Sequence, residues 1–189
     1  IGVPQYDVKE VGTTDKRGTI VTFSPDPTIF TQTTEYKYDT LAGRLRELAF
    51  LNKGITLTLT DERETLEDGT FFSEVFHSDG GLKEFVAFLD GTRASFLPEP
   101  IYIDGIKNGV PVELAFQYND SYSENVHSYV NNINTHEGGT HIAGFRRGLT
   151  RTLKSYADKS GLFKNHKMEI TGDDFREGLT AVVSVTVQE

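Results

Sequence analysis

The sequence contains no cysteine and no tryptophan, and it has a single methionine. Without cysteine the chain can form neither a disulfide nor a cysteine-ligated zinc or iron–sulfur site, and this absence mildly favours the cytoplasm. Long hydrophobic runs are also missing, since no window approaches the roughly 18 apolar residues that a membrane-spanning helix needs. We therefore expect a soluble chain whose 13 phenylalanines and 8 tyrosines supply the core.

The two ends of the sequence lack the features of natural termini. The chain starts at Ile1 rather than at methionine, and no basic segment followed by an apolar run opens it, so we expect no signal peptide. It stops at Glu189 inside a strand-like stretch. We interpret both ends as cuts in a longer protein.

Acidic residues outnumber basic ones, but the charge is unevenly distributed. The net charge is −9, which argues against bulk attraction to nucleic acid. Residues 138–167 nevertheless hold seven basic residues and one acidic residue, a net of +6, which leaves −15 on the other 159 residues. One strongly basic segment therefore lies within an acidic molecule.

The first part of the chain predicts two strand pairs with a helix between them. Residues 18–23, GTIVTF, predict a strand that pairs with residues 5–11. Apolar residues spaced by three or four predict an amphipathic helix over 35–51. Alternating apolar residues then predict two paired strands, over 55–60 and 70–76.

The second part predicts a mainly antiparallel sheet with two helices on one face, an α+β arrangement. The expected elements are a short helix over 82–89 that is capped by Ser78 and Asp79, strands over 101–106, 110–118 and 124–130, a long helix over about 138–158, and a final strand over 178–187. The Asn-Gly pair at 108–109 predicts a hairpin turn. We place the domain boundary between residues 77 and 78, which gives domains 1–77 and 78–189.

The segment GTHIAGF has the glycine spacing of a phosphate-binding loop. However, Phe145 and Arg146 stand where that motif needs lysine and serine or threonine, so the groups that reach phosphate and magnesium are absent. The alternative is that Gly138 and Gly139 form a tight strand-to-helix turn with Thr140 near the helix start. The exposed amides of such a turn could still attract an anion.

The predicted long helix carries an apolar stripe and a basic stripe. Apolar residues at three- and four-residue spacing predict the face that packs on the sheet: Ile142, Phe145, Leu149, Leu153 and Tyr156. Arg147, Arg151 and Lys154 form the basic stripe, with Arg146 to one side. A solvated face is the ordinary explanation of such a stripe, but only Asp158 offers an acidic partner four residues on. Contact with a phosphate backbone is the functional alternative.

The remaining polar clusters give no catalytic site. Asp173 and Asp174 are paired carboxylates, which invite a metal or acid–base interpretation, but capping of a short helical turn explains them better. The five histidines lack the spacing of a helical zinc site. We therefore expect no catalytic residue and no metal ligand in this chain.

Four segments together resemble one known family, the DNA gyrase B subunits. The segments YVNNINTHEGGTHIAGFRRGLTRTLKSY and ITGDDFREGLTAVVSVTV resemble the transducer domain of that family, and RGTIVTFSPDPTIF and LAGRLRELAFLNKGITLTLTDER resemble the end of its ATPase domain. The match covers nearly the whole chain in the same order. The B-type subunit of topoisomerase IV shares much of the pattern and is the alternative.

The resemblance implies a fold and a set of partners. It implies part of a GHKL (Bergerat-type) ATPase domain followed by a left-handed β-α-β transducer domain like that of a ribosomal protein. In the intact subunit it implies ATP and Mg²⁺ as cofactors, and double-stranded DNA, the gyrase A subunit and a second B subunit as partners. It places Arg146, Arg147, Arg151 and Lys154 against the captured DNA, and Thr19 in the wall of the adenine pocket.

The sequence also departs from the family pattern. The catalytic glutamate, the magnesium-binding asparagine and the glycine-rich lid of the family have no counterpart here, and the chain ends at TVQE, before the family's Gln-Thr-Lys loop. We therefore expect the chain alone to bind ATP poorly and not to hydrolyse it. A second hypothesis keeps nucleotide chemistry at EGGTHIAGF, and a third is a structural module whose basic helix binds acidic protein.

Overall fold

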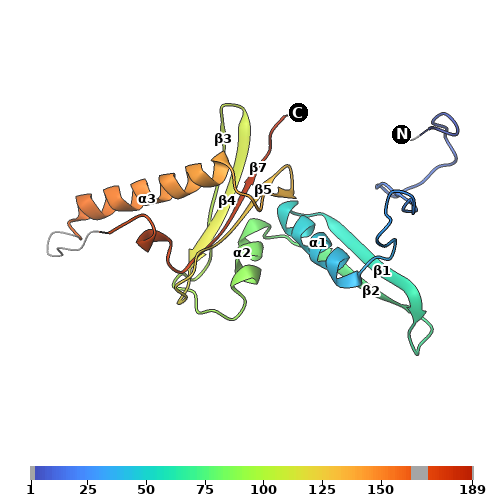
Figure 1. Ribbon diagram of the computed structural model, residues 1–189, viewed down its shortest axis with the longest axis horizontal. Coiled ribbons are helices and arrows are strands. Elements are labelled where there is room, and N and C mark those ends of the chain that lie inside the picture. Colours follow the sequence, from blue (N-terminus) through green and yellow to red (C-terminus); the bar gives the residue numbers. More distant parts are fainter. Residues whose placement is uncertain (1–2, 163–169, 189) are drawn as a thin grey trace. The chain divides into compact units, whose positions relative to one another are not determined.

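The computed structural model describes residues 3–162 and 170–188 (Figure 1). The chain forms two compact units, residues 1–36 and 37–189. All regular elements of the described residues lie in the second unit: α1 (Tyr38–Leu51), β1 (Thr56–Thr65), β2 (Phe71–His77), α2 (Leu82–Asp90), β3 (Ile101–Lys107), β4 (Val110–Tyr118), β5 (Asn125–Val130), β6 (Ile133–Asn134), α3 (Thr140–Ser160), the 3₁₀ turn η1 (Asp174–Arg176) and β7 (Leu179–Val185). The predicted boundary between residues 77 and 78 stays a prediction.

Within its described residues the first unit has neither helix nor strand, so the predicted pairing of 18–23 with 5–11 is wrong. A strand forms only where a neighbouring chain segment takes up its backbone hydrogen bonds, and no described segment does so here. Ile20 and Phe23 accordingly expose 95% and 70% of their surface. Order in this unit is local, as in the turn where the Asp26 carboxylate accepts the Thr28 N–H at 2.9 Å.

The predicted helix and the predicted pair of strands are confirmed, and α1 packs on the two-stranded sheet formed by β1 and β2. Ala42, Ala49 and Phe76 are buried between them, and Leu57 and Leu59 project from β1 into the same cluster. The alternation of β1 follows from this packing, because every second residue of a strand faces the helix. The two strands are antiparallel, with Thr56 opposite His77.

The second sheet has five strands in the order β3-β4-β7-β5-β6. The predicted hairpin is confirmed: Lys107 pairs with Val110, and Asn108 and Gly109 have φ values of 51° and 79°, as a type I′ turn requires. Three of the four strand pairings are antiparallel, whereas β5 and β7 run parallel and are joined through α3. Strand β7 is central and is buried along nearly its whole length. The α+β class is therefore confirmed.

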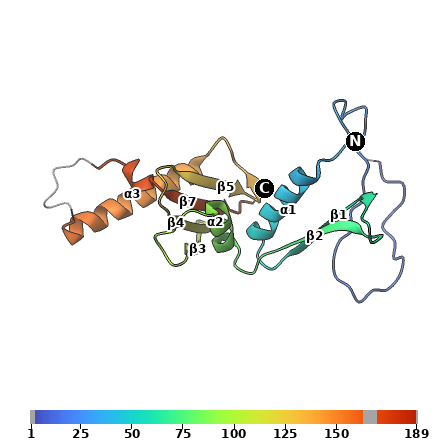
Figure 2. The same ribbon diagram turned by 90° about the horizontal axis from the view of Figure 1, so that it is seen from below.

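The two helices of this part lie on opposite faces of the sheet, so the prediction that they share one face is wrong. Ala115 of β4 belongs to the buried cluster around α2, whereas the next residue, Phe116, belongs to the cluster that contacts α3. Successive residues of a strand point to opposite faces. Burial of β7 on both faces is what requires a helix on each side, and Figure 2 shows the sheet edge-on between the helices.

None of the helices in the described part of the chain is long and apolar enough to cross a membrane.

Candidate nucleic-acid interface

Helix α3 is anchored to the sheet through its first half. Ile142 is 6% exposed, and Phe145 and Leu149 pack on the cluster formed by Phe116, Leu179 and Ala181. The Phe145 and Phe116 rings lie 6.3 Å apart between centroids. The apolar stripe therefore faces the sheet over this half of the helix, as predicted.

The second half of α3 projects away from the sheet (Figures 1 and 2). Tyr156 is 65% exposed, so the prediction that it faces the sheet is wrong. The helix keeps its period, but it has left the sheet before this turn, and only Ala157 is buried there. Gly161 ends the helix in the left-handed conformation, with its N–H bonded to Asp158 O at 3.2 Å.

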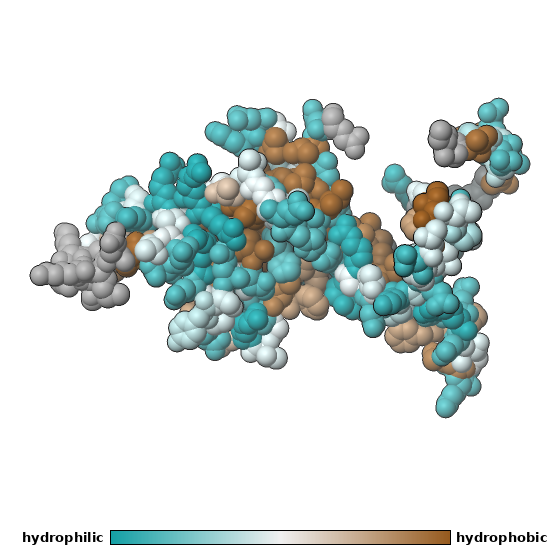
Figure 3. Space-filling view, in the orientation of Figure 1, coloured by the Kyte–Doolittle hydropathy of each residue, from teal (hydrophilic) through white to brown (hydrophobic). Residues whose placement is uncertain are grey.

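Three cations lie on the side of α3 that faces away from the sheet. A helix turns about 100° per residue, which places Arg147, Arg151 and Lys154 about 140–160° from the apolar stripe. All three are exposed, and among the described residues none of them has an ion-pair partner. Arg147 and Lys154 are separated by about 10 Å along the helix axis. Hydrophilic side chains accordingly gather over α3 in the space-filling view (Figure 3).

Arg146 differs from its neighbour Arg147 because its charge is already compensated. Its Nε donates to Glu124 Oε1 at 2.6 Å. The other oxygen of Glu124 accepts from Arg176 Nε at 3.3 Å, and Arg176 also pairs with Asp173. The carboxylate of Glu124 thus joins α3 to the region of η1. Sequence reasoning missed Glu124, because it lies 22 residues before Arg146 and nothing in the local pattern marks it.

The glycines before α3 form the predicted strand-to-helix turn. Gly138 and Gly139 have φ values of 82° and 154°, which glycine adopts without strain. A Cβ at Gly139 would lie 2.8 Å from the His141 ring, which itself lies 3.0 Å from the Thr135 hydroxyl. Thr140 is the first helical residue and makes no side-chain cap. The turn is therefore shaped by packing against His141.

ATP and Mg²⁺, which the resemblance implies for the intact subunit, do not fit the residues described here. Phe145 packs on the sheet and Arg146 pairs with Glu124, so neither is free to contact a phosphate. Thr19 is exposed and lies in the first unit. The described residues also hold no group of three or more histidine or acidic side chains that could bind a metal ion.

Asp173 and Asp174 have separate structural contacts rather than a shared site. Asp174 accepts the backbone N–H of Thr171 at 2.6 Å and its hydroxyl at 2.8 Å, just before η1. These hydrogen bonds hold the pKa of the Asp174 carboxyl below its usual value. Asp173 pairs with Arg176. Neither carboxylate caps η1: Asp173 stands at its N-cap without a side-chain cap bond, and Asp174 bonds back to Thr171, so the capping interpretation is wrong.

The fold and this surface define a class of protein: an α+β protein of net negative charge in which one side of a helix carries three exposed cations without an ion-pair partner among the described residues. The chain belongs to the DNA gyrase B family, because the family model described as DNA gyrase B matches residues 81–189.

Individual relatives agree with this assignment. The DNA gyrase B subunit of Cytophaga hutchinsonii is 65% identical over 188 residues, which make up 100% of this chain and 39% of that relative. Its Staphylococcus aureus counterpart is 50% identical over 184 residues, covering 97% of this chain and 28% of that relative. The chain therefore spans well under half the length of these relatives.

Solved structures show the same likeness. The 43K ATPase domain of Thermus thermophilus gyrase B, in complex with an aminocoumarin, has a TM-score of 0.74 and 35% identity, over 87% of this chain and 43% of that one. The topoisomerase IV ATP-binding domain of Francisella tularensis has a TM-score of 0.63 and 25% identity, over 83% and 40% of the two chains. Both identity and TM-score are higher for the gyrase structure than for the topoisomerase IV structure.

Proposed function

We propose that this chain is the part of an ATP-dependent DNA gyrase B subunit that couples ATP binding and hydrolysis to DNA strand passage and contacts the captured DNA. One observation carries the DNA-contacting role: Arg147, Arg151 and Lys154 are exposed and unpaired within the described residues, on the side of α3 opposite the sheet. Their neighbour Arg146, by contrast, is paired with Glu124. The stripe is therefore available to an external anion.

The rest of the activity is assigned to other parts of the intact protein. We propose ATP and Mg²⁺ as cofactors of the intact subunit, double-stranded DNA, the gyrase A subunit and a second B subunit as its partners, and the cytoplasm as its location. This chain's own residues supply no ATP chemistry in that scheme, because the phosphate-loop positions are occupied by Phe145 and Arg146. Thr19 is proposed to line the adenine pocket only in the intact subunit.

We also propose that the ATPase-domain part ends at residue 77 and the transducer part starts at residue 78. Strand β2 ends at His77, and every strand after it belongs to the five-stranded sheet. The family match begins at residue 81. Both features support a change of domain at this point.

The stripe suits a phosphate backbone for electrostatic reasons. Duplex DNA carries one charge per about 1.7 Å of its axis, so a stripe about 10 Å long meets several phosphates. Three phosphate contacts release counterions and give a slope of about −2.7 in log K against log salt concentration. Affinity from these contacts should then fall roughly 40-fold between 50 and 200 mM salt. No base is read in this way, so the binding is independent of DNA sequence.

The test is a titration of duplex DNA by fluorescence anisotropy at several salt concentrations. In the double variant Arg147→Gln/Arg151→Gln, only one cation of the stripe is left, so the salt slope should become shallower by about 1.8. The matched control is Lys107→Gln/Arg93→Gln, which removes the same charge from exposed positions outside α3. The control should keep the slope of the unaltered chain.

Equal slopes for the unaltered chain and the α3 variant would refute the DNA-contacting role. Equal loss in the α3 variant and in the control would show only an effect of net charge, and would refute it as well. In the structural alternative, the basic stripe pairs with carboxylates of another part of the chain or of a second chain. Within this chain, Arg146 is the one cation among the described residues of α3 that has a carboxylate partner.

A further inference from the structure

The turn between β5 and β6 contacts two parts of the chain that lie far apart in sequence. Val130 pairs with Ile133, so Asn131 and Asn132 form a two-residue hairpin turn. Their φ values are 49° and 65°, the left-handed conformation that asparagine tolerates best after glycine. The side chains of both asparagines are free to bond outside the hairpin, and both do so.

Asn132 is bonded to the end of α1. Its backbone carbonyl accepts from Arg44 Nη2 at 2.7 Å, and its Nδ2 donates to Asn52 Oδ1 at 2.9 Å. Asn52 is the C-cap of α1 and donates its own Nδ2 to Leu48 O at 2.8 Å. An ion pair between Arg44 and Glu47 at 3.0 Å holds the guanidinium in place. The last two turns of α1 are therefore tied to this hairpin turn.

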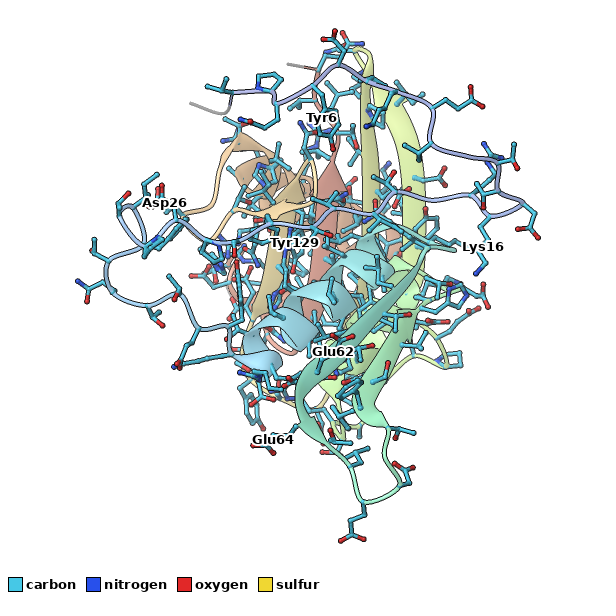
Figure 4. All side chains as sticks on the ribbon, turned by 90° about the vertical axis from the view of Figure 1, so that its right-hand side faces the viewer. Tyr6, Lys16, Asp26, Glu62, Glu64 and Tyr129 are labelled. Atoms are coloured by element: carbon cyan, nitrogen blue, oxygen red, sulfur yellow. The ribbon has the colours of Figure 1, made fainter. Side chains whose placement is uncertain are left out.

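Strand β5 adds a buried contact to the same helix. Tyr129, labelled in Figure 4, is fully buried, and its hydroxyl donates to Glu47 Oε1 at 3.3 Å. Burial and the neighbouring carboxylate both raise the pKa of Tyr129, so the hydroxyl keeps its proton and stays a donor. Displacement of α1 is thus resisted on the strand as well as at the turn.

Asn131 is bonded to the chain that leaves β7. Its backbone N–H donates to Val185 O at 3.0 Å. Its side-chain amide then donates to Val187 O at 3.1 Å and accepts from Val187 N at 2.9 Å. The Asn131 side chain thereby bonds as a backbone peptide group would, and it continues the row of hydrogen bonds past Val185, where β7 ends. The position of Val187 depends on the position of the turn.

We propose that the Asn131–Asn132 turn is a coupling latch that transmits a displacement of α1 to the segment leaving β7. The coupling purpose rests on the function proposed above, whereas the latch itself rests on the hydrogen bonds on its two sides. A cavity of about 460 Å³ beside Asn52, Asn131 and Val187 leaves room for the turn to move. Asn131 and Asn132 are positioning residues in this scheme.

Amide hydrogen exchange of the whole chain tests the latch, because the readout lies on the side opposite the perturbation. Arg44→Gln removes the bond to the Asn132 carbonyl and does not touch Val187. We expect it to speed exchange of the Val187 amide roughly two- to tenfold, the range that one hydrogen bond of ordinary net strength carries. Asn132→Gly, which keeps the left-handed turn but deletes the bond to Asn52, should do the same.

Two controls separate coupling from general loosening. Asn108→Gly makes the same change in the β3–β4 turn, where φ is also positive and the described contacts include no side-chain hydrogen bond of Asn108. Arg46→Gln removes an arginine from the same helix, bonded to Glu74 rather than to the turn. Both controls should leave the Val187 amide unchanged.

Unchanged exchange at Val187 in Asn132→Gly would overturn the latch, whatever Arg44→Gln does. Acceleration that is matched at the core amide of Val182 would also overturn it, because that pattern reports global unfolding. The DNA titration distinguishes the two proposals: the latch variants should keep the full salt slope. Loss of the DNA-contacting role would leave the hydrogen-exchange result standing.

Discussion

Phe85 is expected to hold α1, α2 and the five-stranded sheet together as one cooperative unit. The ring is 2% exposed and stacks on Phe50 of α1, with 5.0 Å between centroids and 15° between planes. It also lies 5.9 Å from the ring of Tyr129 on β5. Phe85→Ala removes a ring that touches three elements, and a change of this kind costs about 3–5 kcal/mol.

The loss of unfolding free energy in Phe85→Ala can be compared with the loss expected at Phe88, a partly exposed residue of the same helix. Phe88 is 53% exposed, and its ring lies 5.5 Å from that of Phe50 and 5.7 Å from the Arg46 guanidinium. Its truncation to alanine should cost about 1 kcal/mol, half the value of a fully buried phenylalanine. For a unit of this size the melting temperature should fall by roughly 6–20 °C in Phe85→Ala and by roughly 2–4 °C in Phe88→Ala.

Urea unfolding followed by far-ultraviolet and near-ultraviolet circular dichroism measures both losses, and amide exchange reports the elements separately. The two spectroscopic transitions should coincide, as they do for a two-state unit. Amides of α1 and of β7 should lose protection to the same extent in Phe85→Ala. The reasoning fails if α1 and β7 unfold in separate transitions, or if Phe85→Ala costs no more than Phe88→Ala.

Two further predictions concern acid stability and a glycine. Burial lowers the pKa values of His127 and His141 from their usual value; the unfolded state then binds more protons at these two residues as the pH falls, so the drop in urea midpoint between pH 7.5 and 5.5 should be smaller in His127→Gln/His141→Gln than in the unaltered chain. Gly178→Ala should cost more than about 2 kcal/mol, because φ is 70° and a Cβ would lie 2.4 Å from Asn119 O. Gly91→Ala, with φ of 59° and nothing within 4 Å of the added carbon, should cost only the left-handed strain of about 1–2 kcal/mol; equal losses measured by thermal unfolding would contradict the steric argument.

Local patterns predict most of the second unit, because its helices and strands show the spacing of apolar residues that is typical of each type of element. The three- and four-residue spacing predicts α1 and α3, and Asn108-Gly109 predicts the β3–β4 turn. The pairing of β5 with β7 could not be read in this way, because it joins residues more than 50 positions apart. The same limit led to the error about the helices: one face of β7 carries Thr180, Val182 and Ser184, a mainly polar pattern, yet Thr180 and Val182 are fully buried in the folded sheet.

Residues 18–23 show the opposite case, in which a correct local pattern does not produce the element. The β-branched and aromatic residues of GTIVTF are typical of a strand, yet Ile20 is 95% exposed. A strand is stable only when a second chain segment lies about 5 Å away and pairs with its backbone. The residues of the strand itself do not show whether such a segment is available. The nucleotide-pocket role of Thr19 depends on the same strand, and that role stays a proposal about the intact subunit.

Arg146 and Arg147 show what the sequence could not predict about the basic residues of α3. It locates them, but it does not tell which of them are already paired with a carboxylate. The two side chains have equal charge and adjacent numbers, and the resemblance places both at the interface with DNA. The structure separates them through Glu124, whose carboxylate lies 2.6 Å from Arg146 and is shared with Arg176. An anion that approached Arg146 would have to displace this carboxylate, whereas one that approached Arg147 would displace only water. Under the proposed function, we therefore expect the DNA affinity of α3 to depend on Arg147, Arg151 and Lys154, whereas Arg146 joins the helix to the region of η1 through Glu124.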